Sequence, residues 1–222
     1  MILYDISMTI NREIAVYKNR AEKRPVFKVT SNFQNRSVYE TRLDMDLHTG
    51  THIDMPLHIY PDGAASEQWS KEEIFTRCVV LDFTANVDDA ITAKHLEQEL
   101  QDAGITGSFF DQRRAVLLKT KNSLQDAFDF NFTYLDKSGA SYLAEKNIRG
   151  VGIDALGIER NQPDHETHKL LLKAGIWIIE GLRLQIVPPG EYILVTMPLK
   201  IEGVEAMPAR SVLLAPNSMP LP

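Results

Sequence analysis

Four apolar runs of strand length constrain the fold of this chain more than any other feature. They are separated by segments with helical spacing of apolar residues, and they read CVVLDF (78–83), AVLLKT (115–120), GVGIDALGI (150–158) and GIWIIEGL (175–182). Near-continuous apolar strands that alternate with helices are typical of a parallel sheet covered on both faces. We therefore expect an α/β protein with a parallel central sheet.

The three intervening helices each have a candidate N-cap, namely Thr92, Ser138 and Asp164. Side chains of these types accept a hydrogen bond from the first free backbone N–H groups of a helix. Glycine favours the left-handed conformation that ends a helix, so Gly104 and Gly175 mark two of the three ends.

The flanks of the chain predict additional antiparallel strands. TRLDMDL (41–47) alternates apolar and polar residues, and EYILVTMPL (191–199) and ARSVLLAP (209–216) follow the turn VPPGE. No linker rich in Pro, Gly or Ser divides these parts from the centre. We expect one domain over residues 1–222.

Composition excludes several classes of partner. The chain has 222 residues and a formal net charge of −6, and its Lys and Arg are scattered, which leaves no basic stripe for nucleic acid. No segment approaches the roughly 20 apolar residues of a membrane span. The single cysteine, Cys78, cannot form an internal disulfide and fits a reducing compartment. We expect a cytoplasmic protein with a small-molecule substrate and neither a nucleic-acid nor a membrane partner.

The stretch LHTGTHIDMPLHIY (47–60) contains three of the six histidines of the chain. In an extended chain from residue 44 onward, His48, His52 and Asp54 share one face, and the alternating apolar residues Leu43, Met45 and Leu47 face the core. Two imidazoles and a carboxylate make half of a zinc or manganese site. The alternative is a set of surface histidines on an edge strand.

The third histidine of this motif, His58, has a different expected role. It lies four residues beyond Asp54 and past Pro56. There it can face the same cavity without binding the ion, as a general base or acid does.

A second cluster occurs in DHETHKLLLKAGIWIIEGL (164–182). His165 and His168 share a face of the predicted helix, and Glu180 alternates with apolar residues in the following strand. A buried carboxylate there needs a cation. The residues alone leave open the alternative of a solvated histidine and a salt-bridged glutamate.

HTGTHIDMPLHIY resembles the His-x-Gly-Thr-His-x-Asp-x-Pro-x-His signature of the bacterial kynurenine formamidase and cyclase family of metal-dependent hydrolases. The similarity extends through YDIS, LLKTKNS, VGIDALGIE, HKLLLKAGIWIIEGL and PPGEYILVTMPLKIEGVEAMPARSVLL. It implies a swivelling β/β/α fold, a homodimer or larger homo-oligomer, and hydrolysis of an amide or cyclic amide.

The resemblance also implies that the protein binds one or two metal ions, with Zn²⁺ expected first and Mn²⁺ as the alternative. It implies that His58 is the catalytic histidine. In the family a histidine precedes the glutamate by twelve residues, and 180 − 168 = 12 selects His168 over His165. The ligands are then His48, His52, Asp54, His168 and Glu180.

The implied reaction is hydrolysis of N-formylkynurenine to kynurenine and formate. A divalent cation lowers the pKa of its water from 15.7 towards about 7, and His58 takes the proton and passes it to the departing amine. The alternatives are a hydrolase of a cyclic amide such as isatin and a non-catalytic metal-binding protein. The chain departs from the family pattern in two places. Gly157 and Glu159 stand where the family has Ser and Asp, and the N-terminal loop reads VYKNRAEKRPVF (16–27). Both places lie where the family shapes its substrate pocket.

Overall fold

Four parallel strands form the middle of the main sheet. The computed structural model describes residues 3–105 and 107–216. The parallel strands lie in the order β5 (Phe75–Asp82), β7 (Ala115–Lys119), β9 (Gly150–Ile153) and β10 (Trp177–Glu180). They correspond to the four apolar runs, and residues 115–118, 150–153 and 177–180 are all buried. Strands buried on both faces need continuous apolar runs, so this prediction is confirmed.

The whole sheet is mixed and closed, which corrects the expectation of a parallel central sheet. Antiparallel neighbours are β11 (Gly190–Pro198), β12 (Ala206–Leu214), β4 (His52–Asp54) and β1 (Leu3–Asp5). The two segments expected after VPPGE are β11 and β12. β12 is nine residues long and pairs with β4 through residues 206–208 and with β1 through residues 212–214. Because β4 also pairs with β10, seven strands close into a mixed barrel.

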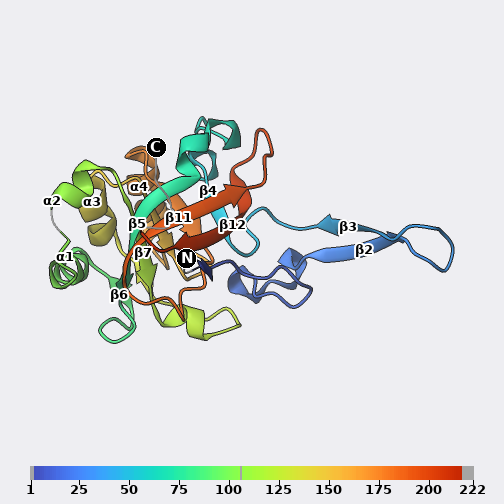
Figure 1. Ribbon diagram of the computed structural model, residues 1–222, viewed down its shortest axis with the longest axis horizontal. Helices are drawn as coiled ribbons and strands as arrows, with labels where there is room; N and C mark the ends of the chain where they lie inside the picture. The colour runs from blue at the N-terminus through green and yellow to red at the C-terminus, as the bar shows by residue number, and fades with distance from the viewer. Residues whose placement is uncertain (1–2, 106, 217–222) are drawn as a thin grey trace.

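Helices cover only the outer face of the parallel part (Figure 1). They are α1 (Ala93–Asp102), α2 (Gly107–Asp111), α3 (Lys137–Glu145) and α4 (Glu166–Lys173). A separate pair of short parallel strands, β6 (Ala90–Ile91) and β8 (Tyr134–Leu135), precedes α1 and α3. Alternation along β5 separates two cores: Val79 and Leu81 pack toward the helices, and Cys78 and Val80 fill the barrel. Burial raises the pKa of the Cys78 thiol, so it is an inert core residue.

One helix start and two helix ends agree with the sequence. Thr92 caps α1 by accepting a hydrogen bond from the backbone N–H of His95 at 3.4 Å. Gly104 and Gly175 follow α1 and α4 with φ of 68° and 71°, the left-handed values that glycine adopts without strain.

Two predicted caps are wrong. Asp136 caps α3, because its carboxylate accepts from the Gly139 N–H at 2.8 Å and leaves the Ser138 hydroxyl to donate to the same carboxylate. Asp164 lies in a 3₁₀ turn ahead of α4, and His165 occupies the N-cap position without a side-chain cap.

A hairpin of β2 (Val26–Ser31) and β3 (Glu40–Asp44) projects from the body of the protein (Figure 1). Among the described residues β3 pairs only with β2, and all five residues of β3 are exposed. The expectation that Leu43, Met45 and Leu47 face the core is therefore wrong, and Leu43 is 43% exposed. No helix in the described ranges is long and apolar enough to cross a membrane.

Candidate metal centre

A turn, rather than a continuous strand, positions the first histidine. β3 ends at Asp44 and β4 begins at His52, so the expected extended chain through this region is broken. Gly50 supplies a left-handed residue with φ of 68°, and its carbonyl oxygen lies 2.9 Å from Nδ1 of His52. The turn thus brings His48 back over the face of β4 that carries His52 and Asp54.

The end of β10 delivers the glutamate. In the antiparallel pairing of β10 with β4, Glu180 lies opposite His52. A Cβ on Gly181 would lie 2.4 Å from the carbonyl oxygen of Gly50, so only glycine permits this close approach of the two backbones. The Thr51 hydroxyl donates to the Gly181 carbonyl at 2.6 Å and holds the contact in place.

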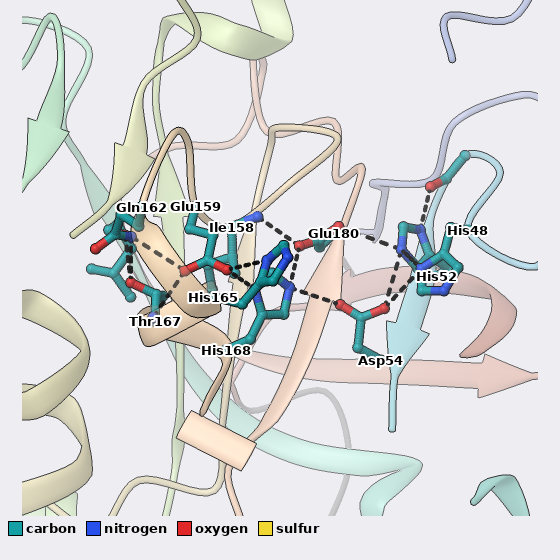
Figure 2. Close-up of polar contacts among 12 residues, drawn as sticks. His48, His52, Asp54, Ile158, Glu159, Gln162, His165, Thr167, His168 and Glu180 are labelled. Atoms are coloured by element: carbon teal, nitrogen blue, oxygen red, sulfur yellow. Dashed lines mark hydrogen bonds and ion pairs between the residues drawn. The ribbon is translucent and has the colours of Figure 1, made fainter. Parts of the chain in front are cut away.

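All five residues predicted as ligands meet in one cluster (Figure 2). Nδ1 of His48 and Nε2 of His52 lie 3.1 and 3.4 Å from Oδ1 of Asp54. Nε2 of His168 lies 3.6 Å from Oδ2 of Asp54 and 3.4 Å from Oε1 of Glu180. His52 and Asp54 are each 1% exposed, so the cluster is inside the protein.

The Asp54 carboxylate tests whether these residues fit a metal ion. Both of its oxygens are buried and, among the described residues, neither accepts a hydrogen bond. Imidazole nitrogens of three histidines lie 3.1, 3.4 and 3.6 Å from these oxygens. A buried carboxylate without donors is costly unless a cation neutralises it. Donor atoms of His52, Asp54 and Glu180 lie close enough together to hold one ion, and nitrogen with oxygen is the donor set of zinc and manganese sites, so the residues fit.

Protonation of the cluster follows from the same contacts. Burial would raise the pKa of Asp54, but the surrounding imidazoles lower it well below its usual value. Burial would lower the pKa of His52, but the Asp54 and Glu180 carboxylates raise it to about 10. A cation that binds here must therefore displace protons from imidazoles.

Glu159 is a functional candidate that the sequence reasoning did not identify. Its Oε1 lies 2.7 Å from Nδ1 of His168, and its Oε2 accepts from the Thr167 N–H at 2.9 Å. A carboxylate on the second ring nitrogen orients a ligand histidine and makes it more basic. The signal was the acidic residue at the position where the family has Asp. His165 contacts Glu159 from the outer side and does not reach Asp54.

His58 lies beside the cluster at the end of a 3₁₀ turn, Pro56–His58. Its ring centroid is 4.3 Å from that of His48 and 5.6 Å from that of His168. No described residue forms a hydrogen bond to its ring, and burial lowers its pKa. His58 also lies close enough to His48 and Asp54 to serve as a ligand, so the geometry permits both a base and a ligand.

A cavity of about 440 Å³ opens over the cluster. His48, His58 and Glu180 line it. Residues of the two segments that depart from the family pattern also line it, at positions 16–18, 20 and 23 and at positions 156, 157, 159, 161 and 162. Both departures therefore face the space in which a small molecule would bind.

A mixed α/β barrel with a His, Asp and Glu cluster at the base of a cavity defines a candidate metal centre. The chain belongs to the family described as "Putative cyclase", whose model matches residues 4–160. It is 31% identical over 216 residues to a kynurenine formamidase of Salinibacter ruber, with 96% of this chain and 97% of that protein covered.

Solved structures share the fold over nearly the whole chain. A potential metal-dependent hydrolase with cyclase activity is 45% identical, with a TM-score of 0.84 and 96% of each chain covered. A predicted metal-dependent hydrolase from Bacillus stearothermophilus is also 45% identical, with a TM-score of 0.81 and 96% and 97% covered. Isatin hydrolase A from Ralstonia solanacearum has the same fold at 21% identity, with a TM-score of 0.79 and 96% and 92% covered.

Proposed function

We propose that this protein is a metal-dependent hydrolase of C–N amide bonds that converts N-formylkynurenine to kynurenine and formate. The observation that carries the proposal is the buried Asp54 carboxylate, whose two oxygens have no donor among the described residues. It contacts His48 and His168, which line the cavity. The substrate is proposed from the kynurenine formamidases to which the chain is similar over nearly its full length.

Five side chains would hold the metal. They are His48, His52, Asp54, His168 and Glu180, with Zn²⁺ as the first choice and Mn²⁺ as the second. When bound, such a cation polarises a carbonyl group and lowers the pKa of water. Glu159 holds Nδ1 of His168 and thereby directs Nε2 toward Asp54 and Glu180.

His58 is the proposed general base and acid. Because burial lowers its pKa, its ring is neutral at pH 7 and can accept a proton from the attacking water. A C–O bond forms at the formyl carbon as the C–N bond breaks, and His58 returns the proton to the departing arylamine nitrogen. A base at the reacting water contributes about 10²- to 10⁴-fold to the rate.

The test is steady-state hydrolysis of N-formylkynurenine and of isatin by protein of measured zinc or manganese content. His58→Ala should lower kcat by about 10²-fold or more and leave the metal content unchanged. His165→Ala is the matched control, since its exposed ring faces Glu159, and it should change neither quantity.

Three results would contradict the proposal. Loss of metal in His58→Ala would make this residue a ligand. Turnover of isatin without turnover of the formyl substrate would assign a cyclic amide. Absence of both activities in metal-loaded protein would leave a metal-binding protein without this chemistry.

We further propose a cytoplasmic homodimer or larger assembly of single-domain chains, joined through the hairpin of β2 and β3. Large apolar side chains gather on this exposed arm: Val26, Val29, Phe33, Val38, Tyr39 and Leu43. Exposed apolar patches of this kind mark interaction surfaces. Light scattering should give a smaller mass for Phe33→Ser/Val38→Ser than for the control Phe130→Ser, whose exposed ring lies off the hairpin. An unchanged mass would contradict this interface.

A further inference from the structure

The cavity carries positive charge that the cluster does not use. Lys18, Arg20 and Lys23 line it from one segment, in a chain whose formal net charge is −6. Lys23 is paired with Asp46 at 2.8 Å. Among the described residues, no carboxylate pairs with Lys18 or Arg20, and both are exposed. Exposed side chains that line the cavity mark its mouth, so two cations with no carboxylate partner in the described part of the chain lie there, with Nζ of Lys18 5.3 Å from the centroid of the Tyr17 ring.

The backbone that presents this pair is strained. Lys18 and Asn19 have φ of 58° and 52°, which costs a non-glycine residue about 1 kcal/mol or more. Asn19 is well suited to this conformation, and its side chain donates to the Phe128 carbonyl at 3.2 Å. Lys18 has no such local compensation. A strained turn that places a lysine at a cavity indicates a functional requirement for that side chain.

Tyr17 connects this turn to the metal centre. Its ring lines the cavity and packs edge-on against Phe128, with centroids 5.1 Å apart. A Cβ on Gly157 would lie 3.3 Å from Cε2 of Tyr17, so the glycine leaves room for the ring. Burial raises the pKa of Tyr17 most, the charge of Glu180 raises it next, and the charge of Arg20 lowers it. The ring is therefore within electrostatic reach of both the cluster and the cationic pair.

We infer that Lys18 and Arg20 form a subsite for a carboxylate that the amide substrate carries away from its scissile bond, with Tyr17 as an aromatic wall of the same cavity. This subsite rests on the proposed function, because the scissile amide is placed at the cluster. It assigns recognition of the remote carboxylate to two residues that line the cavity. Binding by two exposed cations is worth about tenfold in affinity at low salt.

A pair of substrates that differ only in this charge isolates the subsite. They are 4-(2-formamidophenyl)-4-oxobutanoate and its methyl ester. In Lys18→Asn/Arg20→Gln, KM for the acid should rise about tenfold or more, with kcat within about twofold, and both constants for the ester should stay unchanged. Asn is chosen at position 18 because it tolerates the left-handed backbone. The effect on the acid should shrink in 0.5 M KCl, because salt screens exposed charges.

The matched control is Lys94→Gln/Lys200→Gln. These residues are exposed, lie off the hairpin and do not line the cavity, and the variant loses the same net charge. It should leave KM for the acid unchanged. An equal change for acid and ester in the cavity variant, or no change for either, would overturn the subsite.

Failure of the proposed function is distinguished by a binding measurement without turnover. Calorimetry with 4-oxo-4-phenylbutanoate, which has no amide to hydrolyse, reports the subsite alone. Binding to the wild type about tenfold tighter than to Lys18→Asn/Arg20→Gln supports the subsite even if neither formamide is hydrolysed. Equal binding to both proteins overturns it.

Discussion

Two buried aspartates at strand ends differ in the hydrogen-bond donors that surround their carboxylates. Asp54 ends β4 and is 1% exposed, and Asp154 follows β9 and is 4% exposed. Asp154 accepts from the Thr120 N–H at 2.9 Å, from the Thr120 hydroxyl at 2.6 Å and from the Ser123 hydroxyl. Asp54 accepts no hydrogen bond from a described residue. Burial alone therefore does not distinguish the two carboxylates, whereas their hydrogen-bond donors do.

The difference lies in what each carboxylate holds together. Asp154 ties the loop after β7 to the end of β9, entirely through neutral donors. Asp54 is surrounded by imidazoles that can exchange a proton for a metal ion. The first arrangement is complete in the protein alone, and the second is the one that we propose a cation completes.

The largest expected effect is on Asp54. Asp54→Asn retains the shape but removes the charge that neutralises a cation, so bound zinc should fall to background. Activity should fall by about 10³-fold, because the ion supplies several kcal/mol of transition-state stabilisation. Metal analysis and steady-state kinetics measure these changes. Asp154→Asn is the control and should keep its metal; loss of metal from both variants would remove the distinction between the two aspartates.

A smaller effect is expected when Asp154 is deprived of a donor. Thr120→Val removes the hydroxyl bonded to its Oδ1 and should lower the free energy of unfolding in urea by about 3 kcal/mol. Thr84→Val removes a bond of the same length, 2.6 Å, to Asp82, whose side chain is 24% exposed. Water can replace that donor, so the loss should stay below about 1 kcal/mol. Equal losses would show that burial is not the deciding factor.

The pH dependence of stability gives the third effect. Burial raises the pKa of Asp154 from 3.8 to about 6, so between these values the folded state holds a proton that the unfolded state has lost. The contribution of this group to stability therefore falls as pH rises from 3.8 to about 6 and is level above that. Relative to wild type, Asp154→Asn should gain on the order of 2 kcal/mol across this window. A constant difference in urea unfolding at pH 4, 5, 6 and 7 would contradict the shift.

Glu159 lies between the two cases, because it has both a neutral donor, the Thr167 N–H, and an imidazole partner, His168. Glu159→Gln keeps hydrogen-bonding capacity but removes the charge that orients His168. Zinc affinity measured by competition with a chelator should fall by about tenfold. His165→Ala removes the outer imidazole on the same carboxylate and should not change the affinity. An unchanged affinity in Glu159→Gln would make this carboxylate purely structural.

The local patterns predicted much of the secondary structure. Apolar runs identified the four parallel strands, and Thr92, Gly104 and Gly175 marked helix ends correctly, because these signals depend on neighbours within a few residues. The wrong caps at Ser138 and Asp164 have a local cause as well, since a competing carboxylate and a 3₁₀ turn took their places. The hairpin was misjudged because alternation shows that a strand has two faces and does not show whether a core covers one of them.

In the candidate site, too, the sequence predicted what depends on nearby residues and left open what depends on strand pairing. The spacing of His48, His52 and Asp54 correctly predicted that these side chains lie together, although the chain turns at Gly50 instead of running straight. His168 and Glu180 were brought to that half-site only by family resemblance. Residues alone left them as a separate cluster, because nothing near position 180 indicates that β10 pairs with β4.

The sequence by itself determined the parallel strands, the donor types and the spacing of the central motif, because each depends on residues close together in the chain. Only the tertiary structure decided that the sheet closes, that Glu180 lies opposite His52 and that Asp54 is buried without a donor. These features depend on the register of β4 against β10 and β12, strands more than 100 residues away in the chain. That register results from the packing of the whole barrel.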